Sequence, residues 1–403
     1  MAKRLIRILI LTADAGFGHR SAANAVAKAL KLKYQSAVEV RVENPLDLES
    51  APFFLREAQT DYDRWVKQVP ELYKLGYQAS DAAIPTRLLE DSLAVLLFEA
   101  IRDTFSGPLP DVVLTTYPMY QSAIMLLYRL RKIHIPLFTV VTDLSTVHRL
   151  WFNRNVDGCL VPNEIIANLA AVNGVPQDKV HITGIPVSPD ILYETRPAEK
   201  IRAELGWHPE LTTILAVGST RTEKLLEAAS VINHYGSELQ LVVVAGKNEE
   251  LYQELNQIGW HIPVQLFDFV DKVPLLMKAS DLVICKAGGL IVTEALACGL
   301  PMVLTDIIPG QETGNAELIQ RLQAGVVAET PLMMMEALHH FLMNDQKMLR
   351  QYADNARTIG KPAAACDVAE ILYEAGKAST PPKASYRARG FRPAERPLEG
   401  DSE

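Results

Sequence analysis

The chain has 403 residues, 48% of them hydrophobic, and a formal net charge of −8 at pH 7. This length is too great for one ordinary core and predicts two domains, or at most three. An acidic chain lacks the basic field that polyanion binding normally needs, so we expect no nucleic-acid partner.

The cysteines and the amino-terminal residues indicate in which cellular compartment we expect the protein. The four cysteines lie far apart, without a Cys-x-x-Cys pair, so we expect reduced thiols in a cytoplasmic protein and no metal site. The apolar run 8–13 follows basic residues but is too short for the core of a signal peptide. No uncharged apolar stretch approaches about 18 residues, which predicts peripheral membrane contact at most.

Residues 5–12 form a buried-strand pattern that leads into a glycine loop and then a helical pattern over 21–32. Gly16, Gly18 and His19 belong to that loop, at the carboxyl end of the strand. An imidazole there can take a proton from an attacking alcohol; the alternative is a neutral histidine that hydrogen-bonds a phosphate or supports the loop. The Gly-x-Gly-His order differs from the dinucleotide fingerprint, so NAD is not expected.

After a second strand, 37–42, the segment 52–80 is rich in aromatic residues, including Trp65, and basic residues are interleaved with them. Its apolar positions recur at helical spacing, which is typical of a helix lying in a membrane interface. The alternative is an ordinary helix packed on its own domain.

The chain then alternates strands and helices. Strands are predicted after Pro110 and at 136–141, 158–161, 180–183, 211–217, 239–245 and 264–270. The strand at 211–217 meets Gly218, Ser219 and Thr220, where the spacing of Thr220 and Glu223 fits a capping box and predicts the start of a helix.

The stretch 281–315 predicts a strand, a Lys-Ala-Gly-Gly turn, a helix and a second strand. Gly288 and Gly289 let a ligand approach the backbone, and the helix they open offers unpaired N–H groups suited to a diphosphate. Glu294, farther along the helix, can accept hydrogen bonds from the vicinal hydroxyls of a ribose. Its alternative is a glutamate on the helix surface.

Three segments together carry a family resemblance: the Gly-x-Gly-His loop, Thr142–Phe152 (TDLSTVHRLWF) and the motifs Ala-Gly-Gly, Thr-Glu-Ala, Gly-Leu-Pro and Pro-Gly-Gln-Glu-x-Gly-Asn within 281–315. In these the chain resembles the monogalactosyldiacylglycerol synthases and diacylglycerol glucosyltransferases. These enzymes are relatives of the peptidoglycan enzyme that adds N-acetylglucosamine to a lipid-linked precursor.

The resemblance implies an α/β protein of the GT-B fold, in which two Rossmann-like domains with parallel sheets face each other across a cleft. Residues 1–188 would form the acceptor- and membrane-facing domain and residues 189–358 the UDP-sugar-binding domain. Residues 359–376 would form a helix that returns to the first domain. Residues 377–403 are rich in proline and poor in apolar residues, which predicts a disordered tail.

The implied reaction is the inverting transfer of a hexose, glucose or galactose, from a UDP-sugar to diacylglycerol or a related lipid, with no cofactor. His19 and Asp143 would be catalytic, and the general base would be one of His19, Asp143 and His148. Gln311 and Glu312 would hold sugar hydroxyls or, alternatively, cap a helix. The acceptor side would include Gly16, Gly18, Trp65 and His148. The donor side would include Gly218, Ser219, Thr220, Val270, Lys286, Gly288, Gly289, Glu294, Gln311 and Glu312.

We therefore expect a protein bound peripherally to the inner face of the cell membrane, with anionic lipid as a partner. Two other hypotheses remain open from the sequence. One is an enzyme like UDP-N-acetylglucosamine 2-epimerase, acting on a soluble sugar nucleotide. The other is a UDP-sugar-binding protein without catalysis.

Overall fold

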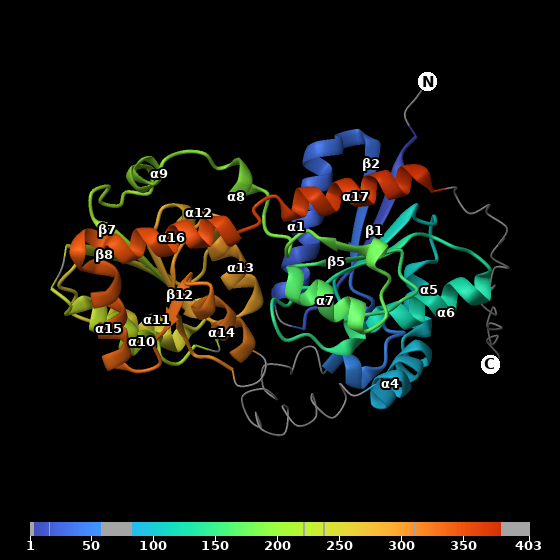
Figure 1. Cartoon of the computed structure of the whole chain (residues 1–403), viewed down its shortest axis with the longest axis horizontal. Helices are drawn as coiled ribbons and strands as arrows, with labels where there is room; N and C mark the ends of the chain where they lie inside the picture. Colours follow the sequence, from blue (N-terminus) through green and yellow to red (C-terminus); the bar gives the residue numbers. More distant parts are fainter. Residues whose placement is uncertain are drawn as a thin grey trace, which may run out of the picture.

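The computed structural model describes residues 4–15, 17–57, 83–220, 222–236, 238–308 and 312–379. Within these ranges the chain forms two parallel sheets of six strands, side by side, each covered by helices (Figure 1). Most of the predicted lipid-facing helix, with Trp65, and the tail from residue 380 lie outside the described residues.

The first sheet has the strand order β2-β1-β3-β4-β5-β6, and all pairs are parallel. Apolar side chains are buried on both of its faces, as expected where helices cover a parallel sheet. Its strands are β1 (Ile6–Leu11), β2 (Val38–Glu43), β3 (Val112–Thr115), β4 (Leu137–Val140), β5 (Gly158–Val161) and β6 (Val180–Ile182). Its helices are α1 (Phe17–Tyr34), α4 (Ala83–Leu96), α5 (Phe98–Thr104), α6 (Gln121–Arg131) and α7 (Glu164–Val172).

The second sheet has the order β12-β11-β10-β7-β8-β9, again with parallel pairs. Its strands are β7 (Thr212–Val217), β8 (Leu239–Val244), β9 (Val264–Phe267), β10 (Leu282–Lys286), β11 (Met302–Thr305) and β12 (Gly325–Val327). Its helices are α10 (Leu225–Asn233), α11 (Glu249–Asn256), α12 (Val273–Lys278), α13 (Gly289–Cys298), α14 (Thr313–Arg321), α15 (Pro331–Leu342) and α16 (Lys347–Ile359). Two short helices, α8 (Asp190–Tyr193) and α9 (Ala198–Glu204), precede β7.

The strand order reverses direction beside β1 in the first sheet and beside β7 in the second. In open parallel sheets, ligands bind outside the carboxyl ends of the strands at such a reversal. The loops that follow β1, β7 and β10 are therefore the expected ligand-binding loops.

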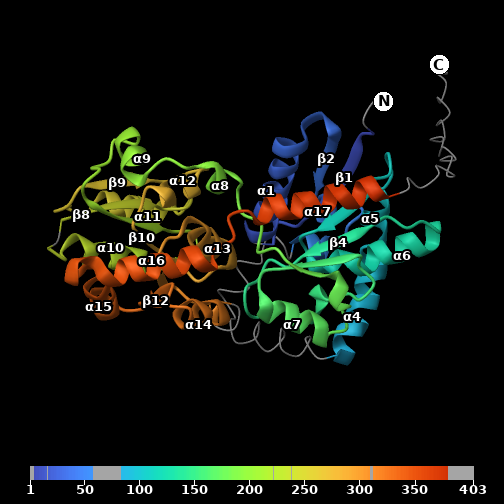
Figure 2. The same ribbon diagram turned by 45° about the horizontal axis from the view of Figure 1, so that its top comes forward.

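The chain crosses between the domains twice, and the two crossings run side by side. Gly184 has φ +88, and a Cβ there would lie 2.6 Å from the Cβ of Lys361 in the second crossing. The returning helix α17 (Ala364–Ala378) lies along the first domain (Figure 2), where the Tyr373 ring stacks on Tyr34 of α1 at 3.8 Å. It ends two residues beyond the predicted boundary at 376.

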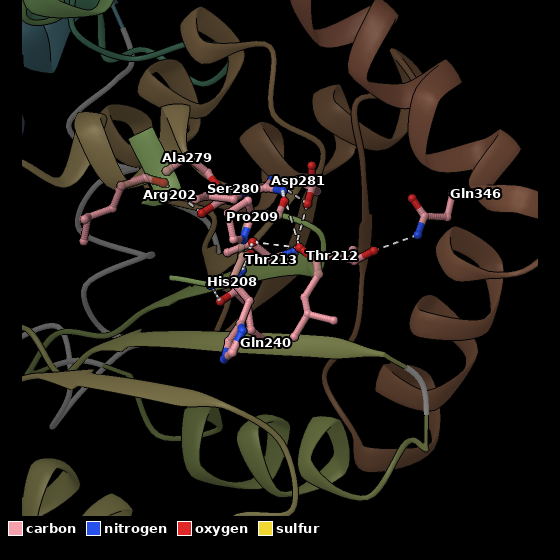
Figure 3. A network of polar contacts seen from close by, with 12 residues as sticks. Arg202, His208, Pro209, Thr212, Thr213, Gln240, Ala279, Ser280, Asp281 and Gln346 are labelled. Carbon is pink, nitrogen blue, oxygen red and sulfur yellow. Dashed lines mark hydrogen bonds and ion pairs between the residues drawn. The ribbon is translucent and has the colours of Figure 1, made fainter. Parts of the chain in front are cut away.

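A buried polar network fixes the amino ends of the strands in the second sheet (Figure 3). Arg202, only 5% exposed, donates Nε to the carbonyl of Ala279 at 2.6 Å and Nη2 to Asp281 at 2.7 Å. Asp281 also accepts the backbone N–H of Thr213 at 2.8 Å. Asp281 therefore has a structural role at this edge, at the amino end of the β10 strand that carries the glycine turn at its other end.

Candidate functional site

A cavity of about 290 Å³ lies between the two domains and is lined by both. Ala15, Gly18, His19, Thr142 and Asp143 come from the first domain. The predicted donor residues among the described part of the chain all line the other side: Gly218, Ser219, Thr220, Val270, Lys286, Gly288, Gly289, Glu294 and Glu312. Gly16 and Gln311 lie outside the described residues.

His19 lies in the first turn of α1, so the prediction that it belongs to the preceding loop is wrong. The hydroxyl of Thr142 is 3.0 Å from His19 Nδ1, so the Thr142–Phe152 segment contributes a hydrogen bond that holds the imidazole ring. Burial lowers the pKa of His19 to about 4, and a hydrogen bond with the Thr116 backbone opposes this shift. The imidazole is therefore neutral at pH 7, as a general base must be.

Asp143 lies just after β4 and lines the cavity on the same side as His19, the side of the first domain. Burial raises its pKa to about 6, and a hydrogen bond from the Trp151 side chain partly opposes this shift. The Trp151 ring also lies 5.9 Å from the His19 ring, centre to centre. One tryptophan thus contacts both candidate catalytic groups.

His148, for which contact with the acceptor is predicted, lies in the segment that leads to Trp151. Its side chain is buried, and Nδ1 accepts the backbone N–H of Leu150 at 3.1 Å. It begins the short 3-10 helix Arg149–Trp151 and does not line the cavity. Its hydrogen bond supports the Trp151 segment, and its contact with the acceptor stays a prediction.

At the start of α13, Gly289 lies close to the backbone of the first domain. Gly288 occupies the N-cap position, and no side chain caps the helix there. A Cβ at Gly289 would lie 3.1 Å from the carbonyl oxygen of Thr142. A larger residue at 289 would therefore push against the first domain as well as against a bound ligand.

Glu294 is buried against the cavity, so the alternative that it is a surface glutamate is wrong. Its burial raises the pKa of the carboxyl to about 7. A carboxyl desolvated in this way gains from hydroxyl donors supplied by a ligand.

Lys286 and Glu312 form an ion pair in the cavity wall, with Nζ 2.9 Å from Oε1. The other carboxylate oxygen of Glu312 accepts the backbone N–H of Ile308 at 3.3 Å. Glu312 occupies the N-cap position of α14 without a side-chain cap hydrogen bond, so the alternative that it caps a helix is wrong.

The capping box predicted for Thr220 and Glu223 is also wrong. Helix α10 begins at Leu225, and its N-cap residue Lys224 makes no side-chain cap hydrogen bond. Asp306, reached from β11, instead accepts the N–H groups of Glu223 and Lys224 at 2.9 and 3.0 Å. A carboxylate of the protein therefore holds the backbone just before this helix.

Sequence reasoning missed Lys247 and Phe269, which both line the cavity. Lys247 Nζ lies 4.4 Å from the centre of the Phe269 ring. The signal was the Gly-Lys pair directly after the strand now seen as β8, at the ligand-binding edge of the sheet. In the described ranges, no cluster of three or more His, Cys, Asp or Glu side chains could hold a metal ion.

Comparison with known proteins gives two matching family models. The model described as monogalactosyldiacylglycerol (MGDG) synthase matches residues 19–187, and the model of glycosyl transferases group 1 matches residues 197–359. The monogalactosyldiacylglycerol synthase of Spinacia oleracea is 30% identical over 381 residues, which cover 91% of this chain and 72% of that protein.

Solved structures confirm the predicted GT-B fold. The MurG structure of Acinetobacter baumannii has a TM-score of 0.57 at 18% identity and covers 92% of this chain and 99% of its own. The UDP-GlcNAc 2-epimerase of Neisseria meningitidis, at 15% identity, has a TM-score of 0.56 over 92% of this chain and 99% of its own.

At these identities the structures show the fold alone, and the sequence relatives decide the class of enzyme. The epimerase and non-catalytic hypotheses are therefore set aside. The chain belongs to the monogalactosyldiacylglycerol synthase family and is a glycosyltransferase.

Proposed function

We propose that this protein transfers a hexose from a UDP-sugar to the hydroxyl of diacylglycerol or a related membrane lipid, with inversion at the anomeric carbon. The observation that carries the proposal is the cavity between the domains. It brings His19 and Asp143 of the first domain to the glycine turn and Glu294 of the second. A sugar nucleotide held by the second domain would present its sugar to the candidate base.

The donor roles follow from the second domain. The open N–H groups at the start of α13 suit the diphosphate, and the buried Glu294 suits the ribose hydroxyls. Because the negative charge of Asp306 lies just before α10, α13 is the better anion site of these two helices. We assign the nucleotide to the backbone of Ser219, Thr220 and Val270. Glu312, together with Gln311, is assigned to the sugar hydroxyls.

In the proposed reaction, the lipid hydroxyl oxygen attacks the anomeric carbon from the face opposite the leaving group, which inverts the configuration. Its proton passes to His19 or Asp143, and UDP departs with the electron pair of the broken bond. The helix amino terminus and lysines of the cavity would stabilise the departing diphosphate without a metal. Full activity in the presence of EDTA is the expected result.

The lipid side is supported by apolar residues on both flanks of the segment 58–82. Phe53 and Phe54 before it are 65% and 56% exposed, and Leu88 and Val95 after it are 65% and 70% exposed. None of the described helices is long and apolar enough to cross a bilayer. We propose peripheral binding to anionic lipid, at the inner face of the cell membrane.

Vesicle sedimentation tests the membrane proposal. The double variant Phe53→Ser/Phe54→Ser should pellet less with anionic vesicles than the wild type. Leu332→Ser, which changes a 65% exposed leucine at the start of α15 in the other domain, is the matched control and should pellet normally. Equal loss in both variants would count against a specific lipid-facing surface.

The function itself is tested by incubating the full chain with radiolabelled UDP-galactose or UDP-glucose over mixed lipid vesicles that contain diacylglycerol. The relative's name makes galactose the first donor to test. A labelled glycolipid with a β-linkage, identified by its anomeric proton coupling, is the expected product. Label that stays in soluble sugars, or an α-linked product, would contradict the proposal.

A further inference from the structure

Two lysines line the cavity among the described residues, and they differ in their counter-charges. Lys286 is paired with the buried carboxylate of Glu312 at 2.9 Å, so the net charge of this ion pair is close to zero. Lys247 has no acidic partner within the described part of the chain, and its ammonium lies over the Phe269 ring. Lys247 is therefore the uncompensated cation of the described cavity wall.

The backbone around Lys247 is held in an unusual conformation. Gly246 and Lys247 have φ values of +69 and +64, and their N–H groups both donate to the carbonyl of Asp268, at 2.8 and 3.2 Å. A left-handed conformation is unfavourable for lysine, and such strain persists mainly where the surroundings enforce it, often at ligand-binding loops. Gly246 itself packs against Gly218, since a Cβ there would lie 2.2 Å from the Gly218 carbonyl oxygen.

The aromatic contact of Lys247 is one that a phosphate can replace. Phe269 is 48% exposed, and a cation–π contact at an exposed site is weak. A hydrogen bond between an ammonium and a phosphate oxygen joins two charged groups and is stronger than such a contact. A diphosphate entering the cavity therefore attracts the ammonium more strongly than the ring does.

We propose that Lys247 is a catalytic residue that binds the diphosphate of the donor and stabilises UDP as it leaves; this inference rests on the proposed function. The bond between the anomeric carbon and the β-phosphate oxygen breaks, and its electron pair stays on that oxygen. The acceptor oxygen forms the new bond to the anomeric carbon, and the acceptor proton goes to the general base. Lys247 keeps its own proton and donates hydrogen bonds to the phosphate oxygens.

Calorimetric titration of the full chain with UDP and with uridine tests the proposal. Lys247→Met keeps the alkyl chain and removes the charge. It should weaken UDP binding about tenfold or more and leave uridine binding within about twofold. Lys247→Arg should stay within about threefold of the wild type for UDP. Lys347→Met, at an exposed lysine that begins α16, is the matched control and should change neither.

The outcomes are separable. Equal weakening of UDP and uridine binding would overturn the proposal, because Lys247 would then act on the uracil ring through Phe269. Unchanged UDP binding would also overturn it. kcat/KM for the donor should fall at least about tenfold in Lys247→Met, and an unchanged value would refute the catalytic role. If Lys247→Met fails to fold, Lys247→Gly removes the charge in a conformation that suits glycine. A wild type that binds no UDP would refute the proposed function instead.

Discussion

His19 and Asp143 border the same cavity but lose their protons in different pH ranges. Burial disfavours the charged form of each, so the pKa of His19 falls to about 4 while that of Asp143 rises to about 6. At neutral pH both are in the proton-accepting form. Either residue could therefore act as the general base, and the difference between their pKa values provides a way to identify which one does.

We predict that His19→Ala lowers turnover on the order of 10²-fold or more, with UDP binding nearly unchanged. Equal loss of turnover and UDP affinity would make His19 a phosphate ligand. In the wild type, kcat/KM should fall on the acid side, because protonation removes the base. A limb near pH 4 identifies His19, and a limb near pH 6 identifies Asp143.

Glu294 gives a second prediction, on the pH dependence of UDP binding. Its carboxyl, with a pKa of about 7 when buried without ligand, must ionise to accept two ribose hydroxyls well. UDP affinity should therefore rise as pH increases through about 7, with protons released on binding. Calorimetry in buffers of different ionisation enthalpy measures that release, and Glu294→Gln should abolish it.

The same pKa shift acts on stability and provides a control. The folded protein binds the Glu294 proton more tightly than the unfolded chain, whose pKa for this group is 4.5. The free energy of unfolding should therefore fall as pH rises from about 4.5 to about 7, and less so in Glu294→Gln. A variant with the wild-type pH dependence would show that Glu294 is not the group responsible.

At the scale of elements, the segment after β11 contacts both the backbone before α10 and the ion pair of Lys286 with Glu312. Asp306, in a left-handed conformation with φ +47, holds the backbone before α10. Two residues later, the N–H of Ile308 donates to Glu312, which pairs with Lys286. The backbone at Glu223 and Lys224, which follows Ser219 and Thr220 in the chain, is therefore held by a carboxylate from a different loop.

We predict that Asp306→Gly, which keeps the left-handed backbone but removes the carboxylate, raises the donor KM roughly threefold to tenfold. Asp306→Asn retains an acceptor and should stay near the wild type. Asp345→Gly removes another left-handed aspartate, with φ +52, beside α16, and serves as the control. A lower melting temperature of Asp306→Gly without any change in the donor KM would show that Asp306 has only a structural role.

At the scale of the whole molecule, the site exists only when the domains are close together. The loop after β4 reaches the second domain at two glycines, Gly289 and Gly314. A Cβ at Gly314 would lie 2.4 Å from Thr146 Oγ1 and 2.9 Å from Ser145 Oγ. Gly314 thus allows a close approach between domains.

We predict that Gly314→Ala lowers kcat several-fold while UDP binding to the second domain stays close to the wild type, because the clash holds the domains apart. Adding Thr146→Ala should restore part of the activity. Gly259→Ala, where a Cβ would meet nothing within 4 Å, is the control. Weaker UDP binding in Gly314→Ala would place the defect in the donor site instead of in domain closure.

The sequence by itself determined the fold class and predicted most of the residues that line the second domain's side of the cavity. Apolar runs predict buried strands, and the glycines that follow them predict the turns at the carboxyl ends of the strands. Both patterns involve only neighbouring residues in the chain. The cavity lining at Gly218, Gly288 and Glu294 lies where those patterns placed it. The family likeness in three separated segments supplied the rest.

Only the tertiary structure decided which local patterns were overridden. Thr220 and Glu223 had the spacing of a cap, yet Asp306, more than 80 residues away, took the N–H groups of Glu223 and Lys224. Glu294 could have been a surface residue until the packing buried it and raised its pKa to about 7. Burial, ion pairing and the approach of another loop are long-range contacts, and spacing along the chain does not encode them.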